Sequence, residues 1–128
     1  WRDWSSDVCS SDLRSGCNPA GEETTDLNAV VFNLELFEAT LRGYLTASKG
    51  TLRPQDFDYL FAAIRLIPLE LGLRFLTDHL AGNPYFKVKR PGHNLDRARV
   101  QFKLTESIEQ QADQIHAIID RLRQTICP

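Results

Sequence analysis

The sequence lacks several features that mark common functional classes. Its formal net charge is only −2 over 128 residues and both signs are interspersed, so no basic or acidic patch indicates nucleic acid or a membrane as a partner. No apolar run is long enough to span a bilayer. Cysteine occurs three times, without a CxxC pair or a histidine at metal-ligand spacing. A disulfide framework and a metal site are therefore not expected, and a reducing, cytoplasmic setting is favoured.

The opening residues 1–13, WRDWSSDVCSSDL, fit no regular element. Their apolar residues follow neither a period of two nor one of 3.6, and no unbroken apolar core or basic leader marks a targeting peptide. Residues 3–13 instead resemble a translated short-read sequencing adapter over eleven consecutive positions. We therefore interpret residues 1–13 as an artefactual or disordered segment. Without them the chain is neutral, because they contain one arginine and three aspartates.

Helical periodicity dominates the rest of the chain. Residues 14–28 are polar with glycine and proline, and are expected to form a loop. Asn33 is predicted to cap a first helix, since its side chain can accept a hydrogen bond from the first turn, and Lys49-Gly50 to close it. The predicted buried face of this helix is Leu34, Phe37, Leu41 and Tyr44.

Proline and glycine divide the second half into further helices. Pro54 suits the first turn of a second helix, and Pro68 is expected to break or kink it. A third helix should stop at Gly82-Asn83, and a connector, extended near 85–88, should lead to Asn94 as the cap of a long last helix. The predicted stripes are Phe57, Leu60, Phe61 and Ile64, then Leu69, Leu73, Leu76 and Leu80, then Phe102, Leu104, Ile108, Ile115, Ile119 and Leu122. The sequence thus predicts an all-α chain of about four helices.

Two acidic motifs invite an active-site interpretation. Asp56 and Asp58 resemble paired metal ligands, but alternate residues on a helix point apart, and acidic residues are common in a first turn. His93 and Asp96 would place a base beside a carboxylate. The simpler interpretation puts His93 in the loop, Asn94 at the cap and Asp96 in the first turn. For both motifs a structural role is favoured over catalysis.

Residues 69–86, LELGLRFLTDHLAGNPYF, are more informative. Arg74 stands in a helix that is apolar over much of its circumference, so it is expected to be partly buried with five N–H donors that need acceptors. Glu70, one turn earlier, could pair with it, or sugar hydroxyls or a ligand carboxylate could accept instead. Tyr85 adds an aromatic wall and a hydroxyl just beyond the helix. A structural ion pair and a ligand site both remain open on these residues.

Three blocks of the chain resemble one enzyme family. They are RSGCNPAGEETTDLNAVVFNLELFEATLRGYL at 14–45, LIPLELGLRFLTDHLAGNPYFKV at 66–88 and RPGHNLDRARVQFKL at 90–104. They are similar, in this order, to the C-terminal part of the phosphotransferases related to aminoglycoside phosphotransferases and choline kinases, and most of all to the N-acetylhexosamine 1-kinase branch. The resemblance implies a protein-kinase-like α+β fold, in which residues 14–128 are the C-terminal helical part. It also implies transfer of the ATP γ-phosphate, with Mg²⁺, to the anomeric hydroxyl of an N-acetylhexosamine.

The resemblance also assigns residues. Arg74 matches a position that donates hydrogen bonds to the sugar, Tyr85 matches a wall and hydroxyl partner of it, and Glu70 would orient Arg74 from behind. Asn83-Pro84 depart from the Asp-Val or Asp-Ile that the family often has, which could alter the approach to Tyr85. The family block at 94–99 is interpreted as caps and ion pairs that dock the last helix, through Asn94, Asp96, Arg97 and Arg99.

The parts of the family that perform phosphoryl transfer are not found. Its catalytic loop, H-x-D followed by Asn, and its metal-binding Asp precede the block that matches residues 14–45, and no Gly-rich loop or phosphate-binding lysine is evident. No catalytic or metal residue is assigned, and the chain alone is expected to be inactive, with neither ATP nor Mg²⁺ bound. The parent's partners would be the amino-sugar and the missing N-terminal lobe, with no nucleic acid and no membrane. The alternative is a small helical binding module without a catalytic role.

Overall fold

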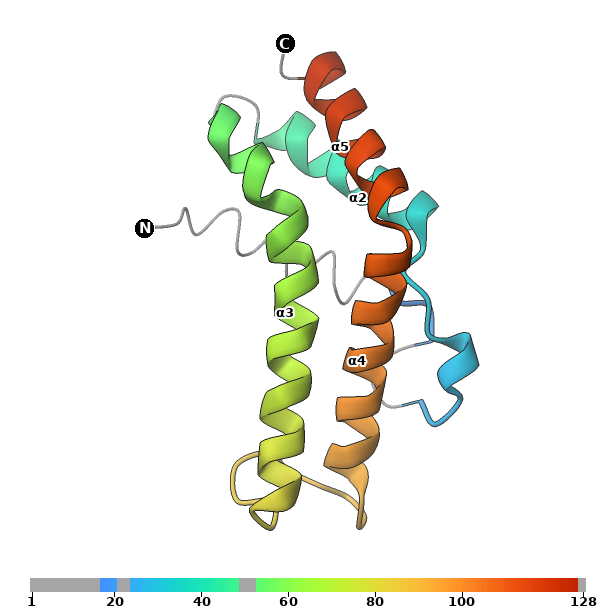
Figure 1. Ribbon diagram of the computed structural model, residues 1–128, viewed down its shortest axis with the longest axis vertical. Coiled ribbons are helices and arrows are strands. Elements are labelled where there is room, and N and C mark those ends of the chain that lie inside the picture. Colours follow the sequence, from blue (N-terminus) through green and yellow to red (C-terminus); the bar gives the residue numbers. More distant parts are fainter. Residues whose placement is uncertain (1–16, 21–23, 49–52, 127–128) are drawn as a thin grey trace.

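The computed structural model describes residues 17–20, 24–48 and 53–126. These residues form four α-helices and one short 3-10 turn, with no strand among them, so the all-α prediction is confirmed (Figure 1). The segment 1–13, the Lys49-Gly50 closure, Cys9 and Cys127 lie outside the described residues. The elements in chain order are η1 (Leu27–Ala29), α2 (Leu34–Ala47), α3 (Pro54–Leu80), α4 (His93–Gln110) and α5 (Ala112–Ile126).

Helix α2 begins as its sequence predicts. The Asn33 side chain accepts a hydrogen bond from the Leu36 backbone N–H at 3.0 Å, which satisfies one free donor of the first turn. The expected apolar face is buried at Phe37 and Leu41, with Leu45 added one turn further on. This face packs against α5, and the pair forms the upper part of the molecule in Figure 1.

Helix α3 runs without interruption through Pro68, which corrects the expected break. Proline removes one backbone donor and crowds the preceding turn, but here its ring is itself buried on the helix face that meets α4. The buried positions keep helical spacing on both sides of the proline, so one long helix covers more apolar surface than two short ones would. The buried residues of α3 are Phe57, Leu60, Ala63, Ile64, Pro68, Gly72, Phe75 and Asp78.

The predicted stripe in the second half of α3 is wrong. Leu73 and Leu80 are 51% and 77% exposed, and they lie on the face that turns away from α4. Tyr59 and Leu66 are exposed on the same face, so large apolar side chains recur there every seven residues. The sequence misled because α3 is apolar nearly all round, and periodicity alone did not show which face meets a neighbour.

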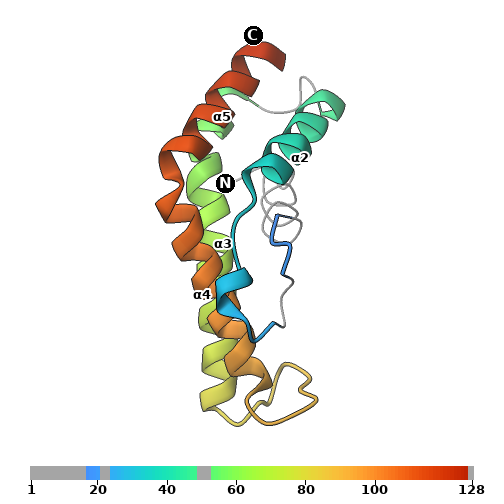
Figure 2. The ribbon, with the colours of Figure 1, turned by 90° about the vertical axis from the view of Figure 1, so that its right-hand side faces the viewer.

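Helices α3 and α4 lie side by side and antiparallel (Figures 1 and 2). The two helices are tightly packed at Gly72, where an added Cβ would lie 2.7 Å from Cε1 of Phe102. On the α4 side, Val100, Leu104 and Ile108 are fully buried. This contact holds the end of α3 in a defined place relative to α4. Among the described residues, no helix is both long and apolar enough to cross a bilayer.

The predicted long last helix is divided at Gln111 into α4 and α5, which corrects that expectation. The Gln111 side chain donates hydrogen bonds to the Phe32 carbonyl at 2.9 Å and to the Ser107 hydroxyl at 3.1 Å. The same Ser107 hydroxyl accepts a hydrogen bond from the Phe32 N–H at 2.9 Å. The segment before α2 is thereby fastened to the junction, and α5 changes direction to pack on α2 (Figure 1).

Candidate functional site

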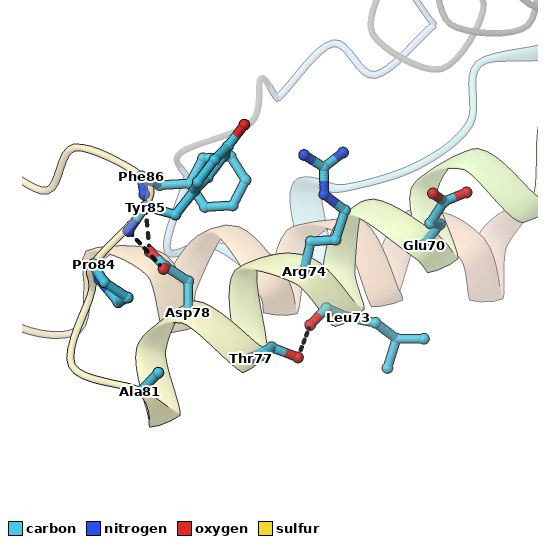
Figure 3. Close-up of a pocket in the computed structure, with 9 residues that line it drawn as sticks. All are labelled: Glu70, Leu73, Arg74, Thr77, Asp78, Ala81, Pro84, Tyr85 and Phe86. Atoms are coloured by element: carbon cyan, nitrogen blue, oxygen red, sulfur yellow. Dashed lines mark hydrogen bonds between the residues drawn. The ribbon is translucent and has the colours of Figure 1, made fainter.

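A groove of about 540 Å³ lies at the C-terminal end of α3, where the following loop folds back along the helix (Figure 3). Its walls include Glu70, Arg74, Thr77 and Asp78 from α3 and Tyr85 and Phe86 from the loop. The structure therefore brings all three residues selected from the sequence to one place. Helix α3 ends as predicted, since Gly82 and Asn83 both have positive φ, of 92° and 65°, and reverse the chain.

Arg74 is exposed, so the expectation that it would be partly buried is wrong. Its guanidinium is 5.7 Å from the centre of the Phe86 ring, which belongs to the loop that follows α3. Glu70 lines the same groove one turn earlier, but its carboxylate and the guanidinium form no ion pair in the described part of the chain (Figure 3). An aromatic ring, and not a carboxylate, is thus the neighbour that Arg74 contacts.

Tyr85 is 75% exposed at the rim of the groove. Its ring meets the Phe86 ring edge to face, with centroids 4.9 Å apart and an interplanar angle of 83°. Figure 3 shows Tyr85 and the Arg74 guanidinium projecting on the same side of α3. A guanidinium, a phenol and an exposed aromatic ring are therefore presented together.

Asp78 is the main residue of this site that sequence reasoning missed. It is 5% exposed, and its carboxylate accepts hydrogen bonds from the backbone N–H groups of Tyr85 at 2.9 Å and Phe86 at 3.0 Å. The Asn94 side chain donates a third, at 2.8 Å. The sequence did contain a signal, because an aspartate in the last turn of a helix opposes the helix dipole and needs partners elsewhere.

Asn94 is not the cap of α4, which corrects a further prediction. Helix α4 begins at His93, after Gly92, which has a φ of 77°. Asn94 is fully buried and uses its side chain to join Asp78 and Asn83, to which it donates at 2.8 Å and 3.1 Å. The Asn94 side chain thus connects α4 to Asp78 of α3 and to Asn83 of the following loop. Local capping rules do not predict such a role.

Four side chains form a stack that leads from the groove into the molecule. The Arg74 guanidinium lies over Phe86, the Phe86 and Phe75 ring centroids are 4.6 Å apart, and the Arg97 guanidinium lies 5.6 Å from the Phe75 centroid. Such cation–ring contacts are favourable, more so where water is excluded. The exposed end of this stack is Arg74, and its other end is Arg97 of α4.

The two acidic motifs have structural partners. Asp56 accepts a hydrogen bond from the Arg53 N–H at 2.8 Å at the start of α3, and Asp58 pairs with Arg123 at 3.5 Å. His93 is buried as the first residue of α4, and its Nδ1 accepts from the Lys89 N–H at 3.2 Å, so the prediction that it stays in the loop is wrong.

The remaining charged residues of the 94–99 block also pair locally. Asp96 lies in the first turn of α4 as expected, and pairs with Arg90 at 2.7 Å and with Arg99 at 3.7 Å. Arg97 donates to the Lys87 carbonyl and to the Asn94 side chain, each at 2.9 Å. These contacts attach the loop to α4, in agreement with a docking role for this block.

Cys17 is the buried thiol of the described residues. It is fully inaccessible, and burial raises the pKa of its thiol from 9.0 to about 11, against a smaller lowering effect of a hydrogen bond with Thr40. At neutral pH the thiol is protonated and therefore a poor nucleophile. Cys17 is part of the core and lies outside the groove.

The chemistry of the groove rests on hydrogen-bonding and aromatic groups. In the ranges 17–20, 24–48 and 53–126, no three His, Cys, Asp or Glu side chains are grouped so that they could hold a metal ion. A comparison of the chain with models of known protein families gives no match. The groove itself offers a guanidinium, a carboxylate, a phenol and an aromatic face, which together match the hydroxyls and the ring of a saccharide.

Proposed function

We propose that residues 14–128 are the C-terminal helical part of a cytoplasmic sugar kinase of the aminoglycoside phosphotransferase family, and that the groove binds its N-acetylhexosamine. One observation carries this proposal. Arg74 and Tyr85, which the resemblance assigns to the sugar, stand in different elements and yet line one groove. In the parent enzyme the γ-phosphate of ATP, with Mg²⁺, would pass to the anomeric hydroxyl of this sugar.

The geometry suggests how each residue would contribute. The Arg74 guanidinium lies 5.7 Å from the centre of the Phe86 ring, and its N–H groups would donate to ring hydroxyls of the sugar. Tyr85 would lay its exposed ring against the C–H face of the sugar and use its hydroxyl as a further partner. Glu70 would accept from a hydroxyl or orient Arg74 once a ligand is bound.

The proposal can be tested with the isotope-labelled chain by nuclear magnetic resonance. Titration with N-acetylglucosamine should shift the Tyr85 and Phe86 amide signals and the Arg74 side-chain signal. Arg74→Ala and Tyr85→Ala should each weaken binding by about tenfold or more, as expected when hydrogen bonds to a charged donor or an aromatic contact are lost. Arg42→Ala and Tyr59→Ala are matched controls, because both residues are exposed and neither lines the groove. Absence of any shift, or equal weakening by the controls, would contradict the assignment.

Two further measurements test whether the chain is a truncated part of a larger kinase. With ATP, Mg²⁺ and N-acetylglucosamine, the purified chain should form no sugar 1-phosphate above a denatured control. Resequencing across the junction at Leu13-Arg14 should reveal an upstream reading frame with H-x-D followed by Asn and a metal-binding Asp. Continuous native DNA that encodes residues 1–13 would count against the truncation.

A second candidate function is a small helical binding module. Its binding surface would be the exposed apolar face of α3 at Tyr59, Leu66, Leu73 and Leu80, because large exposed apolar patches often mark interaction sites. A part of a larger enzyme is expected to expose apolar surface as well, so solution behaviour has to separate the two candidates. A self-sufficient module should unfold cooperatively and remain monodisperse. A part of a larger enzyme should self-associate through such a face, which light scattering can measure.

A further inference from the structure

We infer that Asp78 is the positioning residue of the groove, and that this one buried carboxylate sets the places of both Tyr85 and Arg74. The consequence for ligand binding rests on the proposed function, whereas the positioning itself can be measured without any ligand. Three connected sets of contacts carry the inference.

The first set joins Asp78 to the loop backbone. Oδ1 accepts from the Tyr85 N–H at 2.9 Å, and Oδ2 accepts from the Phe86 N–H at 3.0 Å. Hydrogen bonds to an ionised acceptor are stronger than those between neutral groups. Two successive N–H groups bound to one carboxylate define both the position and the orientation of this part of the loop. Tyr85 is therefore held through its main chain, while its side chain remains exposed.

The second set holds the carboxylate itself. The buried Asn94 side chain donates to Asp78 Oδ2 and to Asn83 Oδ1, at 2.8 Å and 3.1 Å. Arg97 in turn donates to Asn94 Oδ1 and to the Lys87 carbonyl, each at 2.9 Å. The loop is thus attached to α4 before and after Tyr85, and the Asp78 side chain cannot rotate without losing partners on two elements.

The third set extends from Phe86 to Arg74. Because Asp78 fixes the Phe86 backbone, it also fixes the ring, which packs on Phe75 with centroids 4.6 Å apart. The Arg74 guanidinium lies 5.7 Å from the centre of that same ring. Phe86 therefore orients Arg74, and Asp78 acts on Arg74 through Phe86.

The position of Asp78 in the last turn of α3 is not explained by helix stability. A carboxylate in the last turn is disfavoured by the helix dipole, and burying it costs free energy unless hydrogen bonds compensate. Here the compensation comes from the loop and from α4, through the three hydrogen bonds described. The residue is thus used to position the loop, at the expense of local helix stability.

Asp78→Asn tests the inference with little change in shape. The introduced amide nitrogen cannot accept a hydrogen bond, so at least one of the loop N–H groups loses its partner. Hydrogen-exchange protection of the Tyr85 and Phe86 amides should fall by about tenfold or more, and the ring-current shift of the Arg74 side-chain protons should diminish. Asp120→Asn, on the exposed face of α5, removes the same charge and should change neither signal.

Two more variants separate positioning from a general structural effect. Asp78→Asn combined with Asn94→Asp restores a carboxylate–amide pair between the helices. The introduced amide would then donate to α4 and accept from Tyr85, so Tyr85 protection should return while that of Phe86 stays low. Phe86→Leu leaves Asp78 intact. It should abolish the Arg74 ring-current shift while the Tyr85 amide remains protected.

The outcomes distinguish the inference from the proposed function. Unchanged protection in Asp78→Asn would overturn the inference, and so would an equal loss across all amides of α3 and α4, which would indicate general destabilisation. If the unmodified chain binds N-acetylglucosamine, Asp78→Asn should weaken binding, and equal affinity would also overturn the inference. If the unmodified chain does not bind the sugar, the proposed function fails, whereas the exchange data still decide whether Asp78 positions the loop.

Discussion

Replacing Gly72 by alanine should destabilise the chain, even though alanine is the better helix former. Glycine within a helix costs about 1 kcal/mol relative to alanine, so propensity alone predicts a gain. At Gly72, however, the added methyl group would lie 2.7 Å and 2.9 Å from two ring atoms of Phe102 and 3.2 Å from Cβ of Gln101. All three distances are shorter than ordinary van der Waals contact, so the ring or the helices must move.

The magnitude follows from a comparison with a second glycine. Inserting a methyl group into a packed contact costs about 1–3 kcal/mol. Gly43 lies in α2, where an added Cβ would meet no atom of the described residues within 4 Å apart from its own helix turn, so Gly43→Ala should show the propensity gain alone. The difference in unfolding free energy between the two variants removes the propensity effect. We expect this difference to be about 1–3 kcal/mol, with Gly72→Ala the less stable variant.

The assay is denaturant unfolding followed by far-ultraviolet circular dichroism. Adding Phe102→Leu should reduce the cost of Gly72→Ala, because residues in contact are energetically coupled. If Gly72→Ala were as stabilising as Gly43→Ala, the close approach of α3 and α4 would be refuted. α4 could then no longer be taken to fix the end of α3.

Two other predictions concern buried groups. Gln101 is fully buried, and neither polar atom of its side-chain amide has a hydrogen-bond partner in the described part of the chain. Gln101→Leu should therefore raise the unfolding free energy by about 1–2 kcal/mol. A loss of stability in the same denaturant assay would contradict this prediction. Burial raises the pKa of the Cys17 thiol to about 11 in the folded chain, compared with 9.0 for an exposed thiol in the unfolded chain. The unfolded chain therefore releases the thiol proton at lower pH, so stability should fall as pH rises from about 9 to about 11. Unfolding at several pH values should show a smaller fall for Cys17→Ala, and equal falls in both proteins would refute this cause.

Features that depend on neighbouring residues could be predicted from the sequence. The Asn33 cap, the start of α3 at Pro54 and the stop at Gly82-Asn83 each follow from local backbone chemistry. The all-α class follows from periodicity over whole segments. These predictions are confirmed because the local backbone preferences agree with the tertiary structure at each of these positions.

Features that depend on distant residues could not be predicted in this way. Pro68 does not end α3, because burial against α4 continues across it, and Gln111 ends α4 because its side chain reaches Phe32, far away in the sequence. The exposed face of α3 was misassigned because large apolar residues stand on more than one face of the helix. Only the position of α4 decides which of its faces is covered.

Some residues of the candidate site could be selected from the sequence, and others could not. The resemblance selected Arg74 and Tyr85, and the structure places both along one groove. Asp78 and Phe86 escaped notice because their roles exist only once the loop has folded back on α3. An acidic residue in the last turn of a helix, directly before a glycine stop, is the signal by which such a residue could be sought in other sequences.

The contacts that Asp78 makes with the loop go to main-chain nitrogens, which every residue except proline possesses. The identity of the side chain at position 85 is consequently independent of the bonds that hold it in place. A substitution of Tyr85 would therefore change the groups that face a ligand in the proposed binding groove, while the backbone path of the loop stays the same. Under the proposed function, single substitutions at position 85 would therefore change specificity without altering the loop backbone.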